Sequence, residues 1–128
     1  MYINNVVVVG NLTSDPRMSE GDGKVVNFRM AVNRYRKPQQ ESEEAGAQAL
    51  LSTPVKERTE FIDVECWGSQ ADHIDSSLHR GDRAIVAGQL KYDQWNDEDG
   101  NMKSRIRIRA QAVGASLEFQ DVSRPAGA

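Results

Sequence analysis

The chain has 128 residues, of which 16 are basic and 19 acidic, so its formal net charge at pH 7 is −3. This length favours one domain over two. Its apolar runs are short, as at Val6 to Val9, which excludes the stretch of about twenty apolar residues that a membrane-spanning helix needs. The N-terminus lacks the basic and apolar regions of a secretory signal. We therefore expect a cytoplasmic protein with no membrane partner.

Cysteine and histidine content argues against disulfides, zinc and cofactors. Cys66 is the only cysteine and is expected to be a small buried hydrophobic residue. His73 and His79 are not accompanied by a Cys-x-x-Cys pair, which argues against a zinc site. Gly-rich phosphate loops are absent. The sequence predicts no metal and no cofactor.

The acidic residues are unevenly distributed along the chain. The net negative charge would not attract a polyanion. Without residues 38–55 and 110–128, however, 15 basic and 14 acidic residues remain. The excess acid therefore belongs to a predicted loop and a predicted tail.

The first half of the chain predicts two strands and a loop. Residues 5–12 are β-branched and apolar enough for a strand buried on both faces, starting near residue 3. Residues 13–23 carry Asp-Pro and Gly-Asp-Gly turn chemistry. Residues 24–36 alternate between apolar and polar, which predicts a strand with one inward face. Residues 38–55 lack a sustained apolar period and predict a mobile inserted loop.

A third strand and the only good helix follow. Residues 59–67 alternate again, with Ile62, Val64 and Cys66 on the inward face. Residues 69–80 predict a helix of about three turns that has Ser69 as its N-cap and ends at Gly81.

The last elements form a hairpin. Residues 83–92 and 102–114 predict two strands, joined by a polar tip at 93–101 whose Asp-Gly pair fits a tight turn. Three strands, a helix and a hairpin are the element order of an all-β, five-stranded OB-fold barrel with one short helix between strands three and four. We predict an OB domain over residues 1–115 and a short tail over 116–128.

Aromatic residues are the clearest functional signal. Phe61 and Trp67 share the outward, charged face of the third predicted strand, where a large ring needs the helix, a loop, another subunit or a ligand as its partner. Trp95 lies among acidic residues at the predicted hairpin tip, where a core role is hard to arrange. Together with Tyr35, these rings suit base stacking, which contributes roughly 1–3 kcal/mol per base whatever the sequence.

Basic residues interleave with these rings. Four of them, at every second position from Lys103 to Arg109, share one face of the last predicted strand, where unscreened like charges are destabilising. A polyanion ligand would neutralise them. In the alternative, this is a solvated edge neutralised by Asp63, Glu65 or the acidic cluster Asp97 to Asp99. The predicted residues that bind single-stranded DNA are Arg29, Asn33, Arg34, Tyr35, Arg36, Lys37, Lys56, Phe61, Trp67, Lys91, Trp95, Lys103, Arg105, Arg107 and Arg109.

Catalytic patterns are weak by comparison. His73 and His79 are expected to be surface residues on or at the end of the helix. Asp97, Glu98 and Asp99 would bind a divalent cation in an OB-type nuclease, but three carboxylates at a turn are more often a solvated tip. No pairing of a nucleophile with a base is found, and we predict that the protein is not an enzyme.

The segments together resemble the bacterial single-stranded DNA-binding proteins. The resemblance is carried, over about residues 4 to 109, by Asn5-x-Val-x-x-x-Gly-Asn-Leu, Phe28-Arg-Met-Ala-Val32, Thr59-Glu-Phe-Ile-Asp-Val-Glu-Cys-Trp-Gly68, Leu78-His-Arg-Gly-Asp82 and Gly88-Gln-Leu90. It implies an OB fold, a homotetramer, and roles in DNA replication, recombination and repair at the nucleoid. The family's stacking rings would correspond to Tyr35 or its neighbour, Phe61, Trp67 and Trp95.

The sequence departs from the family's pattern in two places. The loop at 38–55 is longer and more acidic than is usual. The family typically ends in an acidic tip closing in Pro-Phe, which recruits replication and repair proteins, whereas this sequence ends in Ser123-Arg-Pro-Ala-Gly-Ala128. A short paralogue specialised for a subset of DNA transactions or a truncated product would explain the difference.

Two other hypotheses compete with nonspecific binding of single-stranded DNA. One is a protein-interaction or replication-restart module on the same fold that binds DNA weakly. The other is the metal-dependent nuclease that uses the acidic hairpin tip. Stacking and phosphate contacts alone also discriminate poorly between DNA and RNA.

Overall fold

The computed structural model describes residues 1–21, 23–36 and 55–123, and for residues 35, 36 and 55–57 only the backbone. Within these described ranges, six strands and one helix follow in chain order: β1 (Val6–Leu12), β2 (Arg17–Glu20), β3 (Lys24–Arg36), β4 (Val55–Trp67), α2 (Ser69–Ser77), β5 (Arg83–Asn96) and β6 (Met102–Ala115). The predicted mobile loop at 38–55 lies outside the described residues, except for Val55 at the start of β4.

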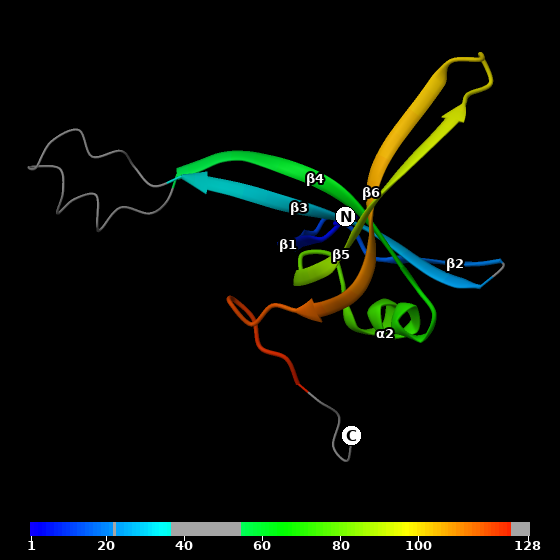
Figure 1. The fold of residues 1–128 in the computed structure, drawn as a ribbon. Helices are drawn as coiled ribbons and strands as arrows, with labels where there is room; N and C mark the ends of the chain where they lie inside the picture. The colour runs from blue at the N-terminus through cyan, green and yellow to red at the C-terminus, as the bar shows by residue number, and fades with distance from the viewer. Residues whose placement is uncertain (22, 37–54, 124–128) are drawn as a thin grey trace, which may run out of the picture.

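The strands form one sheet that closes on itself. Their order is β1-β5-β6-β4-β3-β2, and an additional pairing of β1 with β3 completes a ring. β4 pairs with β6 in parallel, while the other pairings are antiparallel. Gly10 permits the β1–β3 approach, because a Cβ atom there would collide with the carbonyl oxygen of Ala31. This closed sheet with one helix between β4 and β5 confirms the predicted OB architecture (Figure 1).

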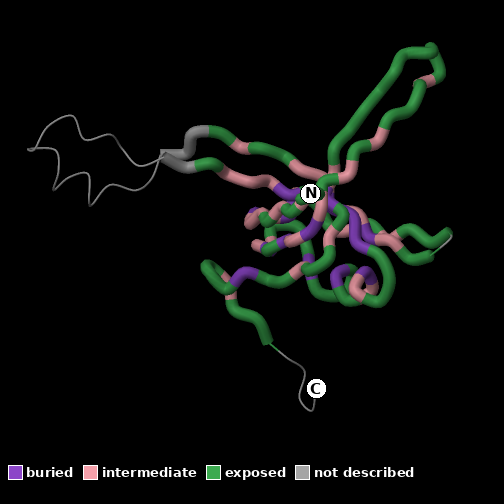
Figure 2. Tube along the Cα trace, in the orientation of Figure 1, coloured by how far each residue is buried: buried purple, intermediate pink, exposed green. Residues whose placement is uncertain are grey.

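Buried residues gather at the centre of the fold, where the strands of the ring cross (Figure 2), and together with residues of the helix they form the hydrophobic core. In β3 and β4 the predicted inward faces are confirmed, since Val26, Met30, Val64 and Cys66 are each at most 1% exposed. The helix covers one end of the ring. The buried hydrophobic core consists of Leu12, Val26, Phe28, Met30, Val64, Cys66, Ala71, Ile74, Leu78, Ala84, Val86 and Ile108.

The prediction for β1 is wrong on one face. Val6 and Val8 pack against the core as expected, but Val7 is 67% exposed. Its outward neighbour on β5, Ala87, offers only a methyl group. Since an OB ring is a single layer around its core, a strand of one chain is buried on both faces only where something else covers the outside.

Two local predictions also fail. β2 lies inside the segment predicted as a turn and pairs with the start of β3. The helix ends at Ser77, and its N-cap is Gly68, at a φ of +78° and without a side-chain hydrogen bond, so Ser69 is the first helical residue. The backbone geometry of Gly68 replaces the predicted hydroxyl cap, because this φ lies in a region that glycine adopts at little cost.

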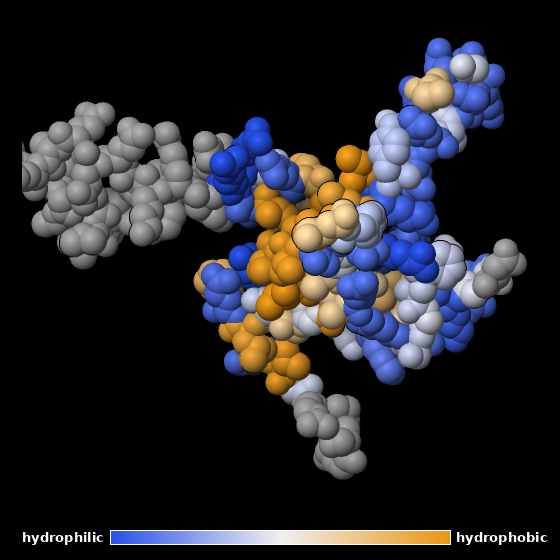
Figure 3. Space-filling model, viewed as in Figure 1, coloured by the Kyte–Doolittle hydropathy of each residue, from blue (hydrophilic) through white to orange (hydrophobic). Residues whose placement is uncertain are grey.

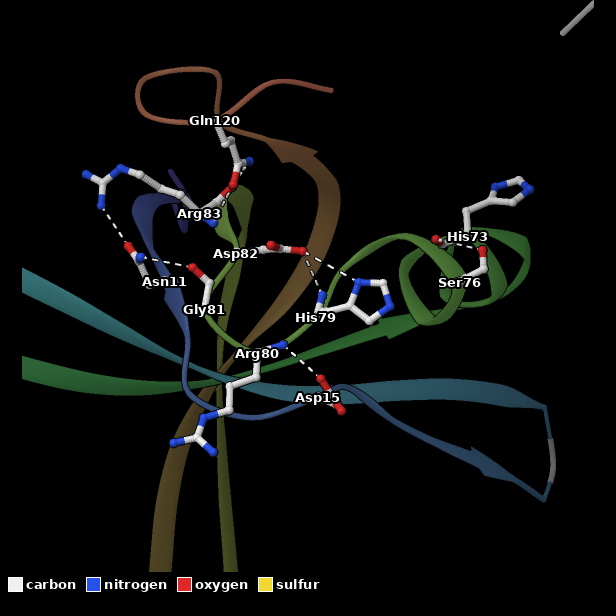
Figure 4. A network of polar contacts seen from close by, with 10 residues as sticks. All are labelled: Asn11, Asp15, His73, Ser76, His79, Arg80, Gly81, Asp82, Arg83 and Gln120. Carbon is white, nitrogen blue, oxygen red and sulfur yellow. Dashed lines mark hydrogen bonds and ion pairs between the residues drawn. The ribbon is translucent and has the colours of Figure 1, made fainter. Parts of the chain in front are cut away.

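The segments around the α2–β5 connection are joined by polar contacts (Figure 4). The Asn11 side chain accepts from the Arg83 guanidinium at 2.9 Å and donates to the Gly81 carbonyl at 3.2 Å. The Gln120 side chain binds the backbone of Arg83 in both directions, at 3.2 Å and 2.9 Å, and Ser116 donates to the Arg83 carbonyl at 2.9 Å. The first residues after β6 are therefore held against the start of β5.

The hairpin of β5 and β6 extends beyond the ring as an arm (Figure 1). Its strands continue to Asn96 and Met102, so the predicted polar tip is shorter than expected. Asp97 organises the turn, since its Oδ1 accepts from the backbone amides of Asp99 at 3.0 Å and Asn101 at 2.8 Å. The register shift between Ala87 and Gly88 lies within the ring, where Gly88 still pairs with Val6 of β1, and the arm begins beyond the Lys91–Arg107 pair, the last one in which β6 also pairs with β4.

Candidate nucleic-acid interface

The register of four strands places most of the predicted site on one outward face of the sheet, here called the charged face. Asp63 at the centre of β4 pairs with Arg29 on β3 and with Arg107 on β6. Arg107 in turn pairs with Lys91 on β5. Neighbouring residues in register point to the same side of a sheet. The charged face consists of Asn27, Arg29, Phe61, Asp63, Glu65, Trp67, Gln89, Lys91, Asp93, Trp95, Lys103, Arg105, Arg107 and Arg109.

Three of the predicted stacking rings are exposed on the charged face. Phe61 is 63% exposed, Trp95 46% and Trp67 41%. Each tryptophan has an arginine over its ring, with a distance from Cζ to the ring centroid of 5.9 Å both for Arg109 over Trp67 and for Arg105 over Trp95. A guanidinium at this distance is attracted by the ring quadrupole. Each pair thus presents a flat apolar ring beside a cation.

The cations near β4 are paired with carboxylates. The Arg29 Nε donates to Asp63 Oδ1 at 2.9 Å, and this bond raises the pKa of the exposed guanidinium. The Glu65 side chain, only 2% exposed, contacts Lys91 Nζ at 3.5 Å and Arg107 Nη1 at 3.1 Å. Burial of a carboxylate requires such partners, and Arg107 is itself 16% exposed.

Carboxylates also accompany the cations of the arm. Arg107 Nε lies 2.9 Å and Arg105 Nε 3.9 Å from Asp93 Oδ2, and Lys103 Nζ lies 3.9 Å from Asp97 Oδ2. Carboxylates were the alternative partners expected for the four basic residues of β6. Of the carboxylates named for this role, Glu65 contacts Arg107 and Asp97 contacts Lys103. Asp93 is an additional partner that sequence reasoning missed, and β6 is an interior strand of the ring rather than an edge.

The remaining predicted residues lie toward the far ends of β3 and β4. The Asn33 Oδ1 accepts from the Thr59 hydroxyl at 2.7 Å, across the two strands. Arg34 is exposed and sits at a register shift. The backbones of Tyr35, Arg36 and Lys56 belong to β3 and β4, whereas their side chains and all of Lys37 lie outside the described residues.

A polar cavity of about 610 Å³ opens on the charged face. It brings Arg17 of β2 together with Arg29, Arg105 and Arg107. Arg17 was missed because its segment reads as a turn. The only sequence signal for a strand at this place is the run of four residues from Arg17 to Glu20 that directly precedes Gly21. The other lining residues are Thr13, Ser14, Asn27, Phe28, Asp63 and Val64.

Comparison with known proteins identifies the family. The model of the "Single-strand binding protein family" matches residues 3–116. The chain belongs to this family. It is 32% identical over 124 residues to a single-stranded DNA-binding protein of Corynebacterium glutamicum, covering 94% of this chain and 51% of that protein. A protein of the same name from Thermus aquaticus is 33% identical over 84% of this chain and 36% of its own length. The chain thus spans about half or less of these relatives.

Solved structures of similar proteins share the fold. A small single-stranded DNA-binding protein from Streptomyces coelicolor superposes with a TM-score of 0.71 at 25% identity, over 91% of this chain and 97% of that one. A Plasmodium falciparum protein solved in complex with single-stranded DNA gives the same TM-score and coverage at 19% identity, which supports the fold alone. The family's OB fold is therefore confirmed for this chain.

A second outward face of this family member is apolar. Val7 and Val9 of β1 lie beside Ala87 and Ile85 of β5, and Ile85 is 41% exposed. Figure 3 shows apolar side chains gathered over β1 and near the last described residues. Phe119, 76% exposed with the Arg83 guanidinium 5.3 Å from its ring centroid, extends this surface. We call it the apolar face, made of Val7, Val9, Ile85, Ala87, Ala112, Gly114 and Phe119.

Other predicted features behave as surface groups. His73 and His79 are exposed, as expected. Among residues 1–21, 23–36 and 55–123, no three His, Cys, Asp or Glu side chains are placed to share a metal ion. Within the same residues, α2 is too short and polar to cross a membrane, and no other helix there is long and apolar enough to do so.

Proposed function

We propose that the protein binds single-stranded DNA without sequence preference and without a catalytic step. One observation carries the proposal: in a chain of the single-strand binding protein family, Trp67 and Trp95 are exposed on the charged face, each with an arginine beside its ring. Bases would stack on these rings and on Phe61, because every base has a π face. Stacking therefore tolerates any sequence.

The cations of the charged face would contact the phosphates. Arg29, Lys91 and the basic residues of β6 surround the rings, so a strand stacked on the rings would have its backbone within reach of them. Phosphate contacts release counterions and make the affinity depend on salt. Tyr35, Arg36 and Lys56, whose backbones belong to β3 and β4, remain predicted contacts, as does Lys37, which lies outside the described residues.

We further propose that the protein assembles into a homotetramer through its apolar face. Contiguous exposed apolar surface marks a contact with another protein. Val7, Ile85 and Phe119 supply that surface, while alanine and glycine between them would allow a close approach of backbones. A symmetric oligomer would cover the same face on each copy and leave the charged faces open to DNA.

Such a protein would act at the nucleoid in the cytoplasm, covering single strands during replication, recombination and repair. Replication and repair proteins would be its further partners. In the competing replication-restart module, DNA binding would be weak and would not depend on the rings.

Intrinsic tryptophan fluorescence tests the proposed function. Oligo(dT) should quench Trp67 and Trp95, and the affinity should fall as salt rises, whereas a duplex of equal length should bind much more weakly. Absence of both quenching and a gel shift would refute the proposal. A Trp95→Ala variant with unchanged affinity would favour the interaction module instead. An oligo(rU) competitor then measures the preference for DNA over RNA.

A further inference from the structure

Asp93 is an acidic residue in the middle of the proposed binding surface. Asp93 lies between Lys91 and Trp95 on the charged face of β5, and it pairs with Arg105 of β6. Its side chain is 28% exposed. A carboxylate at this position opposes the binding of any polyanion, so its presence there calls for a physical reason.

Asp93 lies against two arginines that a bound DNA strand would use. Its Oδ2 lies 2.9 Å from Arg107 Nε and 3.9 Å from Arg105 Nε. The short contact lacks the alignment of a hydrogen bond, since neither Asp93 Oδ2 nor Arg107 Nε has a hydrogen-bond partner. Arginine binds carboxylates and phosphates best through aligned, paired bonds. The Asp93 contact is therefore weaker than the one a phosphate could form with the same guanidinium.

Glu65 holds Arg107 from a second direction. Its Oε2 lies 3.1 Å from Arg107 Nη1, and its side chain is 2% exposed. Because Glu65 is buried, it would keep Arg107 in place while a different anion replaced Asp93. The two carboxylates thus differ, since the Glu65 side chain is 2% exposed and the Asp93 side chain 28% exposed, although the Asp93 Oδ2 atom in contact with Arg107 is buried.

Both arginines are also open to the polar cavity. Arg105 and Arg107 line it together with Arg17 and Arg29. An anion in this cavity of about 610 Å³ could reach their guanidinium groups. Asp93 is not part of the cavity lining.

We propose that Asp93 is a specificity-determining residue that stands in for a phosphate in the free protein, and that a bound strand exchanges this carboxylate for one of its own phosphates on Arg105 and Arg107. This inference rests on the proposed function. Because the cations are already occupied, a polyanion that offers charge alone gains little, whereas a strand that also stacks on Trp67 and Trp95 still binds. Specificity then comes from an element that acts against the wrong ligand.

Asp93→Asn removes the competitor, and Glu98→Gln is its matched control. Glu98 lies on the same arm, is exposed, and has no ion pair among the described residues, so the control loses the same charge without freeing an arginine. We expect Asp93→Asn to bind oligo(dT) about two- to fivefold more tightly than the control at low salt. Its plot of log affinity against log salt should also be steeper, by about 0.7. Equal affinity and slope in the two variants, or weaker binding by Asp93→Asn, would overturn the inference.

A readout without DNA separates this inference from the proposed function. On a heparin column, Asp93→Asn should elute at higher salt than Glu98→Gln, and Asp93→Glu should elute with the native chain. If the native chain fails to bind oligo(dT), the proposed function fails, and co-elution of Asp93→Asn with the control would overturn the inference as well. The thermal midpoint of each variant verifies folding, and Asp93→Ser provides a second uncharged replacement.

Discussion

The charged face and the apolar face point away from the same core, yet they differ in every physical property that matters for binding. Strand β4 and the arm part of β5 present rings among the paired charges of β6, and the buried Glu65 contacts Arg107. Strand β1 and the start of β5 present valine, isoleucine and alanine. The same alternation of side chains produces both faces. The residues left over from core packing, rather than the core, therefore distinguish a surface for a polyanion from a surface for another protein.

The largest effect is expected from a charge placed on the apolar face. In Val7→Asp, a carboxylate without a partner would be buried on association, at a cost of several kcal/mol. We expect this variant to sediment as a monomer at concentrations where the native chain is oligomeric. Ser19→Asp adds the same charge at an exposed position of β2 and should leave the subunit count unchanged. A Val7→Asp oligomer of native size would show that the apolar face has another role.

The second largest effect is expected on stability, from removal of the buried Glu65 carboxylate of the charged face. Glu65→Gln leaves the mostly buried Arg107 with one carboxylate instead of two. Removing one partner of a buried pair costs roughly 3–5 kcal/mol, and the Asp93 carboxylate that remains beside Arg107 lowers this, so we expect a loss of about 2–3 kcal/mol in the free energy of unfolding in urea. Glu60→Gln, on the same strand but 55% exposed, should cost less than about 1 kcal/mol. Equal losses in the two variants would show that burial does not increase the contribution of Glu65 to the free energy of unfolding.

Removal of single rings should affect DNA binding and not folding. Trp67→Ala and Trp95→Ala should each weaken oligo(dT) binding by about 1–3 kcal/mol, with Phe at either position restoring part of it. Tyr92→Ala is the comparison, because Tyr92 is 58% exposed on the opposite side of the same arm. Fluorescence anisotropy with labelled oligo(dT) measures all three. A Tyr92→Ala loss as large as that of Trp95→Ala would contradict the assignment of DNA to the charged face.

The smallest effect is a pH dependence that originates in the core. Burial raises the pKa of the Cys66 thiol. The neutral thiol therefore stabilises the folded state fully below the unfolded pKa of about 8.5, and that stabilisation is lost as the pH rises through the higher folded pKa. Urea unfolding between pH 7 and pH 10 should show a steeper loss of stability for the native chain than for Cys66→Ala. Parallel profiles would exclude this contribution.

Periodicity within one strand was enough to predict much of the binding surface. The alternation in β3 and β4 separated Val64 and Cys66 from Phe61 and Trp67, and the structure keeps that division. It failed where the answer depends on neighbouring strands. The partners of Arg107 follow from a parallel β4–β6 register and an antiparallel β5–β6 register, which no single strand encodes.

Prediction from sequence also failed for the short strand β2 and for the exposed outward side of β1. β2 has four residues, and the glycines at its end outweigh any strand signal, so Arg17 was not assigned to the site. In β1, a run of four valines carries no alternation. Such a run cannot distinguish a strand covered within one chain from one that leaves Val7 exposed.

Light scattering of the native chain, alone and with oligo(dT), tests the difference between the two faces most directly. We expect a mass of four protomers without DNA, and an increase by the mass of the bound oligonucleotide with the subunit count unchanged. A monomer whose mass does not change when oligo(dT) is added would contradict both the assembly through the apolar face and the binding of single strands on the charged face.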